Sequence, residues 1–193
     1  MTAECTTKQD LLRLGLELLL KHGYTDLSVA TLLERAGVPK GSFYHHFGSK
    51  ESFGLQAIDL YMTGVHAALD RAFGDNGREP LEQIRDFFAM VSAGYKGDGY
   101  LGCLLGGLGQ ELSGISPVFR KKVESCFSLI ARRFEKALAR AKTAGQLRHD
   151  ADPRELADLL VNCWEGAALR SRLRRSPAPL GQMLDFYLTS VRP

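Results

Sequence analysis

The sequence predicts an all-α protein, and three observations support this class. Apolar residues recur at three- and four-residue spacing through most of the 193 residues. Glycine and proline divide the chain into segments of helical length. No segment shows the two-residue alternation of a half-buried strand. We therefore expect three short helices in a first domain, residues 1–54, and a larger helical bundle in residues 55–193.

The composition is that of a globular chain, with 45% hydrophobic and 24% charged residues. Its net charge of +3 is compatible with a nucleic-acid partner but does not require one. Its four cysteines form no C-x-x-C pair, so we expect neither a metal site nor a cofactor. The chain shows no signal peptide and no membrane-spanning segment, which predicts a cytoplasmic protein with reduced thiols.

The first helix is predicted from about Thr7 to Gly23, because this stretch is rich in leucine and ends at glycine. Ser28 is a suitable N-cap for a second helix. Gly37 lies where a left-handed residue would end that helix. Pro39 suits an extended position before a third, short helix. This order predicts a helix, a tight turn and another helix.

The third helix is too short to be stable alone, so its aromatic residues must attach it to the rest of the domain. Phe43 and Phe47 are four residues apart and therefore share one face. The remaining cations, hydroxyls and imidazoles face outward, which suits the major groove of DNA. The residues predicted to contact DNA are Thr31, Lys40, Ser42, Tyr44, His45, His46 and Lys50.

The charge balance of the N-terminal segment limits how it can bind DNA. Residues 1–54 carry six Lys and Arg against six Asp and Glu, so phosphate affinity must come from local placement rather than from net charge. Two copies of this N-terminal domain in a dimer would double the number of contacts with DNA. The other open interpretation is a polar, exposed helix without a partner, and for Thr31 capping or solvent exposure explains the residue equally well.

The bundle is expected to begin with a long helix that Ser49 caps, followed by a helix from Pro80. The glycine-rich stretch 94–109 is expected to be broken. Three further helices are predicted, at 118–144, from Pro153 after an Asp152 cap, and at 180–191.

Cys103 is the most distinctive residue of the bundle, because its glycine neighbours would leave the sulfur accessible. Its thiolate would add to an electron-poor alkene, quinone or aldehyde. The alternative is a small buried hydrophobe, which is also our interpretation of Cys126 and Cys163, whereas Cys5 falls in a frayed tail. Trp164 suits a pocket wall or the core, and Glu165 suits a polar anchor. The predicted ligand-binding residues are Phe88, Tyr95, Cys103, Gln110, Trp164 and Glu165.

The N-terminal pattern resembles the TetR family of transcriptional repressors. The matching residues are Ala36-Gly37-Val38, Gly41-Ser42-Phe43-Tyr44, His46-Phe47, Ser49-Lys50-Glu51 and Phe53, whereas Leu32-Leu33 replaces the usual Ile-Ala pair. The bundle resembles the branch of NemR-like and AcuR-like regulators. The residues that carry this second likeness are Gly102-Cys103-Leu104, Leu108-Gly109-Gln110-Glu111 and Trp164-Glu165-Gly166-Ala167.

The resemblance implies a homodimer with a helix-turn-helix at each N-terminus and a ligand pocket in the C-terminal bundle. The branch implies an inducer that is a reactive electrophile or a small unsaturated acid. We therefore expect a repressor rather than an enzyme. This repressor binds double-stranded operator DNA, and a small-molecule inducer releases it. Dimerisation is expected through helices 153–173 and 180–191. Two other hypotheses stay open: a small enzyme with Cys103 as nucleophile, and a helical protein-binding module without DNA.

Overall fold

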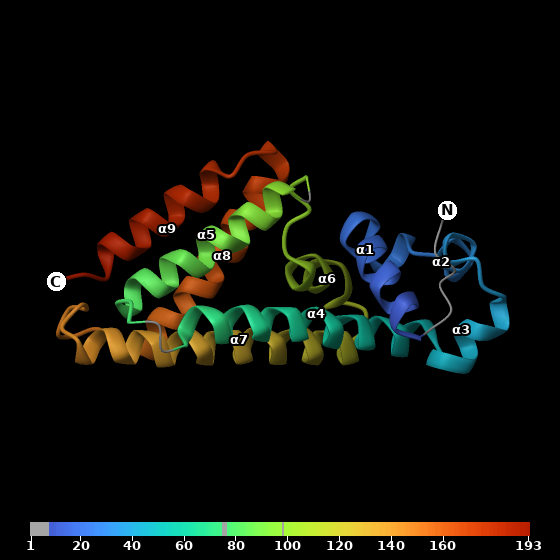
Figure 1. Ribbon diagram of the computed structural model, residues 1–193, viewed down its shortest axis with the longest axis horizontal. Helices are drawn as coiled ribbons and strands as arrows, with labels where there is room; N and C mark the ends of the chain where they lie inside the picture. The colour runs from blue at the N-terminus through green and yellow to red at the C-terminus, as the bar shows by residue number, and fades with distance from the viewer. Residues whose placement is uncertain (1–7, 75–76, 98) are drawn as a thin grey trace. The chain divides into compact units, whose positions relative to one another are not determined.

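The computed structural model describes residues 8–74, 77–97 and 99–193, and within them it shows nine α-helices and no strand (Figure 1). The all-α prediction is therefore confirmed. The helices are α1 Lys8–Asp26, α2 Val29–Ala36, α3 Lys40–Phe47, α4 Lys50–Phe73, α5 Pro80–Gly97, α6 Leu104–Leu112, α7 Pro117–Thr143, α8 Pro153–Arg174 and α9 Ala178–Ser190. Among the described helices, none combines the length and apolarity needed to cross a membrane. Cys5 lies outside the described residues.

The chain folds as two compact units. The first contains the N-terminal helices up to Gly64 together with Leu104–Val123, and the second contains Val65–Cys103 together with Glu124–Pro193. The first unit therefore includes α6, which the sequence analysis assigned to the bundle. The functional boundary at residue 54 stays a prediction.

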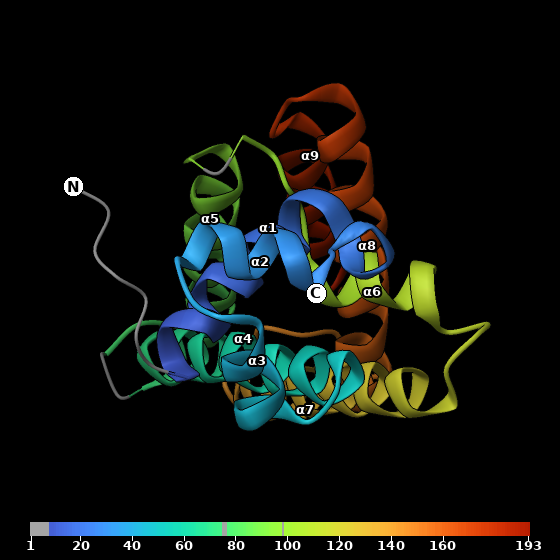
Figure 2. The ribbon, with the colours of Figure 1, turned by 90° about the vertical axis from the view of Figure 1, so that its right-hand side faces the viewer.

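The turn between α2 and α3 is built by local capping, as predicted. The Ser28 hydroxyl accepts a hydrogen bond from the Thr31 amide at 3.0 Å and so begins α2. Gly37 ends α2 in the left-handed conformation, at φ 69° and ψ 28°. Pro39 is extended, and α3 begins at the next residue. Figure 2 shows the two short helices that result.

Three phenylalanine rings attach α3 to the rest of the first unit. Phe43 and Phe47 of α3 and Phe53 of α4 are all buried, and each pair of ring centroids lies 5.1 to 5.3 Å apart. The Phe53 ring also lies directly against the backbone of α1 at Gly15. The expected inward face of Phe43 and Phe47 is confirmed, and it leaves the opposite side of α3 free for other contacts.

The second unit has its own hydrophobic core, to which α5, α8 and α9 contribute together with parts of α4 and α7. Phe88 stacks on Phe134 at 5.1 Å between centroids and lies 4.1 Å from the Trp164 ring. The Tyr187 hydroxyl of α9 donates to the Leu156 carbonyl of α8 at 2.7 Å. Trp164 is thus a core residue as well as a candidate pocket wall.

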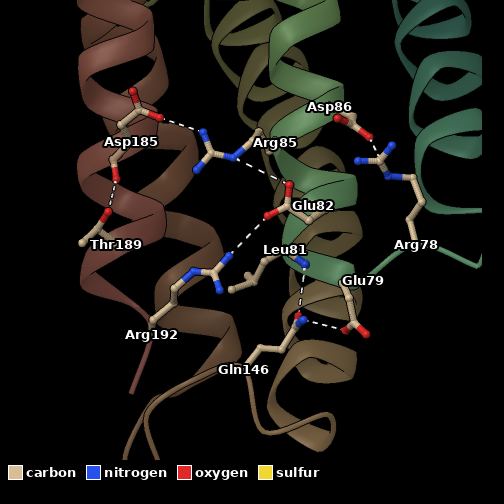
Figure 3. A network of polar contacts seen from close by, with 10 residues as sticks. All are labelled: Arg78, Glu79, Leu81, Glu82, Arg85, Asp86, Gln146, Asp185, Thr189 and Arg192. Atoms are coloured by element: carbon tan, nitrogen blue, oxygen red, sulfur yellow. Dashed lines mark hydrogen bonds and ion pairs between the residues drawn. The ribbon is translucent and has the colours of Figure 1, made fainter.

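Surface ion pairs connect α9 to α5 in the same unit (Figure 3). Arg85 of α5 contacts Asp185 of α9 at 2.7 Å, and Arg192, just after α9, reaches Glu82 of α5 at 3.3 Å. These side chains are all at least a third exposed, so each pair contributes roughly 1 kcal/mol or less. The core, rather than this network, provides most of the stability of the unit.

Two expected segments differ from the structure. The stretch 94–109 is not broken throughout, because α5 continues to Gly97 and α6 begins at Leu104. The buried side chains of Leu104, Leu105 and Leu108 outweigh the low helix propensity of the glycines between them. The first helix differs only in extent: its helical geometry breaks at Gly23 as predicted, at φ 80°, but a further turn of α1 follows to Asp26.

Candidate DNA-binding face and ligand cluster

The outer side of α3 carries most of the residues predicted to contact DNA. Lys40, Tyr44 and His45 are exposed, and Ser42 and His46 are partly buried. Tyr44 packs edge-on against Phe43 at 5.4 Å between centroids, yet 48% of its surface stays exposed. The aromatic packing therefore fixes the position of a helix whose polar side is open to a partner.

Thr31 has a local role in addition to any contact with DNA. Its hydroxyl lies 2.7 Å from the Ser28 hydroxyl, and its amide donates to the same oxygen. The residue is exposed. The structure thus shows the capping role directly, and a contact between Thr31 and DNA stays a prediction.

Lys50 begins α4 and already has partners within the first unit. Its ammonium donates to the Thr25 carbonyl at 3.4 Å and lies 4.6 Å from the centre of the Tyr24 ring. Burial lowers the pKa of Lys50, while the charges of Glu111 and Asp26 oppose this shift. A contact between Lys50 and a DNA phosphate stays a prediction. The Thr25 carbonyl and the Tyr24 ring already hold the Lys50 side chain in the position from which it would make that contact.

Glu111, which is not among the predicted site residues, lies in α6 and reaches the end of α1. Its carboxylate accepts the amide of Tyr24 at 2.9 Å and the amide of Thr25 at 2.5 Å. Burial alone would raise the pKa of Glu111, but the hydrogen bonds from Thr25 and Tyr24 and the charge of Lys50 outweigh it and lower this pKa. Its partners lie more than 80 positions away, so only the likeness around Gln110 drew attention to this segment.

The second unit brings four of the predicted ligand-binding residues together. The Trp164 indole and the Cys103 thiol lie within hydrogen-bonding reach of the Tyr95 hydroxyl, and Cys103 lies within the same reach of Glu165. Phe88 contacts Trp164 from the core side. Tyr95, Cys103 and Glu165 are each partly buried. We call Tyr95, Cys103, Trp164 and Glu165 the thiol cluster.

Protonation within the thiol cluster is perturbed by its surroundings. Burial raises the pKa of Glu165 to about 7, although a hydrogen bond with Cys103 opposes this shift. Burial, with the nearby Cys103 and Glu165, also raises the pKa of Tyr95 well above its usual value. Near neutral pH the Glu165 carboxyl therefore exists in both forms and can either donate or accept a proton.

Gln110 is the one predicted ligand-binding residue that lies in the first unit, whereas the thiol cluster lies in the second. It lies on α6 in the first unit and is exposed. Its role in ligand binding stays a prediction.

Two arginines at the end of α8 contact the loop before α6, which is far from them in the sequence. Arg175 donates to the Gly99 carbonyl at 2.8 Å, and Arg172 packs beside Gly102. These contacts connect the end of α8 to the loop that carries Cys103.

Two family models match this chain, the bacterial regulatory proteins of the tetR family over residues 11–56 and the tetracyclin repressor-like C-terminal domain over residues 80–187. The chain belongs to the TetR family. It is 40% identical to the transcriptional regulator AcuR of Cereibacter sphaeroides over 89% of this chain and 79% of that protein. The crystal structure of a regulatory protein TetR from Rhodobacter sphaeroides matches with a TM-score of 0.90 at 38% identity, covering 95% of this chain and 97% of that one.

The crystal structure of reduced Escherichia coli NemR matches with a TM-score of 0.84 at 27% identity, covering 95% of each chain. The predicted likeness to the NemR and AcuR branch is therefore confirmed. These relatives are transcriptional regulators, so the prediction of a TetR-type repressor rather than an enzyme is also confirmed at the level of the family. Regulators of this family bind operator DNA and act as dimers with small-molecule ligands.

Proposed function

We propose that this chain is a cytoplasmic, homodimeric repressor that places one α3 helix of each protomer in a major groove of its operator. The observation that carries the proposal is the fixed position of α3, which three buried rings attach while its polar side stays open. A dimer of such heads reads two half-sites separated by about one or more helical turns. The predicted contacts are those of Thr31, Lys40, Ser42, Tyr44, His45, His46 and Lys50.

Exposed apolar side chains on α8 and α9 support the homodimer. Leu159, Gly166 and Leu173 are exposed and follow one another at seven-residue steps, so they share one side of α8. Phe186 of α9 is 77% exposed. Large apolar side chains exposed on two helices that pack against each other, such as Leu159, Leu173 and Phe186, favour a protein interface. Sedimentation at micromolar concentration is expected to show a dimer, and a monomer alone would contradict this part of the proposal.

The thiol cluster supports a site for the inducer. Its thiol lies near both the Tyr95 phenol and the Glu165 carboxyl, and the Tyr95 ring lies 6.2 Å from the Trp164 ring between centroids, a combination that suits a small molecule with an electron-poor alkene or a short unsaturated acid. Bond formation at Cys103 would favour a conformer whose heads do not fit both half-sites. A tenfold loss of affinity requires a preference of about 1.4 kcal/mol for that conformer.

Fluorescence anisotropy with DNA from upstream of its own gene tests the repressor proposal. We expect saturable binding that is stronger than binding to scrambled DNA at moderate salt. Equal affinity for the two duplexes would contradict it. Intact-mass analysis with a panel of electrophiles, with Cys103→Ser as the control, tests the inducer. An adduct at Cys103 together with DNA release would support a covalent inducer, whereas release without a mass change would support a bound acid.

A further inference from the structure

The end of α1 depends on a carboxylate from another part of the sequence. Gly23 interrupts the helical geometry of α1, so the amides just after it lack the regular partners of a helix. Glu111 of α6 supplies both acceptors, one oxygen to the Tyr24 amide and the other to the Thr25 amide. The Tyr24 amide is partly buried and the Thr25 amide is exposed, and by accepting from both the carboxylate stabilises the turn from α1 to α2.

The same carboxylate also connects to the start of α4. Lys50 contributes favourable charge to Glu111 and donates to the carbonyl of Thr25, the residue whose amide Glu111 accepts. Tyr24 fits between Lys50 and Phe119, whose ring centroid lies 4.9 Å from that of Tyr24. The end of α1, the start of α4 and the last turn of α6 thus meet at one group of side chains.

The backbone at this junction admits little variation. A Cβ atom on Gly23 would lie 2.8 Å from a Glu111 oxygen, and the positive φ of Gly23 disfavours any L side chain. A Cβ atom on Gly54 would lie 2.8 Å from both the Tyr24 and Phe119 rings. The Glu111 carboxylate thus lies directly against the backbone at Gly23, and the Tyr24 and Phe119 rings lie directly against the backbone at Gly54.

We propose that Glu111 is a positioning residue for operator binding, which holds α1, and through the α1–α2 turn the recognition helix α3, in the orientation that fits DNA. This inference rests on the proposed function and adds which residue holds the recognition helix in position. Because α6 begins at the residue after Cys103, Glu111 lies one short helix away from the thiol cluster along the chain. A displacement of α6 along its own axis would remove the carboxylate from the Tyr24 and Thr25 amides.

The test compares Glu111→Gln with the charge-matched control Asp59→Asn. Asp59 of α4 forms an ion pair with Lys122 in the same unit, so both variants lose one carboxylate that joins two segments. Removal of a negative charge near DNA by itself strengthens non-specific binding. We expect Glu111→Gln instead to lose about tenfold in operator affinity, with no loss for scrambled DNA, and Asp59→Asn to lose none.

Amide hydrogen exchange of the folded protein tests the contact independently of DNA. We expect exchange of the Tyr24 and Thr25 amides to be about tenfold or more faster in Glu111→Gln and unchanged in Asp59→Asn. Unchanged exchange at these amides, or operator affinity within twofold of the original protein, would overturn the inference. If the original protein binds no DNA specifically, the proposed function fails, and the exchange measurement still decides whether Glu111 holds the end of α1.

Discussion

Gly15 offers a test in which two physical effects predict opposite signs. Alanine in the middle of a helix is favoured over glycine by about 1 kcal/mol, so propensity alone predicts that Gly15→Ala stabilises the protein. The structure predicts the reverse. A Cβ atom on Gly15 would lie 2.1 Å from the Phe53 Cζ atom and 2.9 Å from its Cε2 atom.

The Phe53 ring has little room to retreat, since Phe43 and Phe47 pack against it at 5.3 and 5.1 Å between centroids and all three rings are buried. Overpacking in such a site costs typically about 1–3 kcal/mol and occasionally more. A contact as close as 2.1 Å indicates the upper part of that range. After the gain in propensity is subtracted, we expect Gly15→Ala to lower the free energy of unfolding by about 1–2 kcal/mol.

Urea unfolding followed by circular dichroism measures this effect. The single tryptophan, Trp164, lies in the second unit, so its fluorescence spectrum in the absence of urea provides an internal control that Gly15→Ala is expected to leave unchanged. The double variant Gly15→Ala, Phe53→Leu makes space for the methyl group and is expected to cost less than the sum of the two single variants. A higher unfolding midpoint for Gly15→Ala, or strict additivity in the double variant, would refute the packing argument.

Three further predictions follow from the same structure. Tyr44→Ala is expected to abolish operator binding in anisotropy while circular dichroism stays unchanged, because the ring is half exposed; retained binding would contradict its predicted contact. Gly37→Ala is expected to lower the free energy of unfolding by about 1 kcal/mol in the same urea titration. The cause is conformational strain alone, because no atom lies within 4 Å of the added Cβ. Gly37→Asn should lower the free energy of unfolding by less, because asparagine tolerates the left-handed conformation better. Because the pKa of Glu165 is raised from 4.5 to about 7, the folded state binds the proton more tightly than the unfolded state, so this residue's contribution to stability falls as pH rises through that window. Urea unfolding followed by Trp164 fluorescence should show this slope in the original protein and a flatter one in Glu165→Gln, and equal slopes would rule it out.

Local signals made the head predictable from the sequence. A serine cap, a left-handed glycine and two aromatic residues four apart each depend on neighbours within one helical turn. Ser28, Gly37, Phe43 and Phe47 accordingly occupy the predicted conformations and environments. The fold of α2 and α3 follows from these few positions because they all specify the same helix–turn–helix arrangement.

Long-range contacts explain what the sequence could not predict. The glycines around α6 disfavour a helix by propensity, and only packing against α1 stabilises it. Glu111 lies beside the predicted Gln110, but its partners on α1 are distant in sequence, and no local pattern distinguishes these two polar neighbours. The residues of the thiol cluster are predicted from their side-chain chemistry and, for Cys103, Trp164 and Glu165, also from the family likeness. The perturbed protonation of Glu165, by contrast, depends on burial that only the fold creates.

The contacts of Lys50 are compatible with both the junction at Glu111 and a DNA phosphate. An ammonium group has three N–H donors, and the Thr25 carbonyl uses one of them, so donors remain for a phosphate. Glu111 meanwhile offsets part of the Lys50 charge. Loss of the Glu111 carboxylate would therefore free Lys50 to attract DNA more strongly while it releases the end of α1. Because these two effects have opposite signs, weaker operator binding by a folded Glu111→Gln protein cannot come from the change in charge and supports the loss of positioning, whereas stronger binding would mean that charge alone matters at this junction.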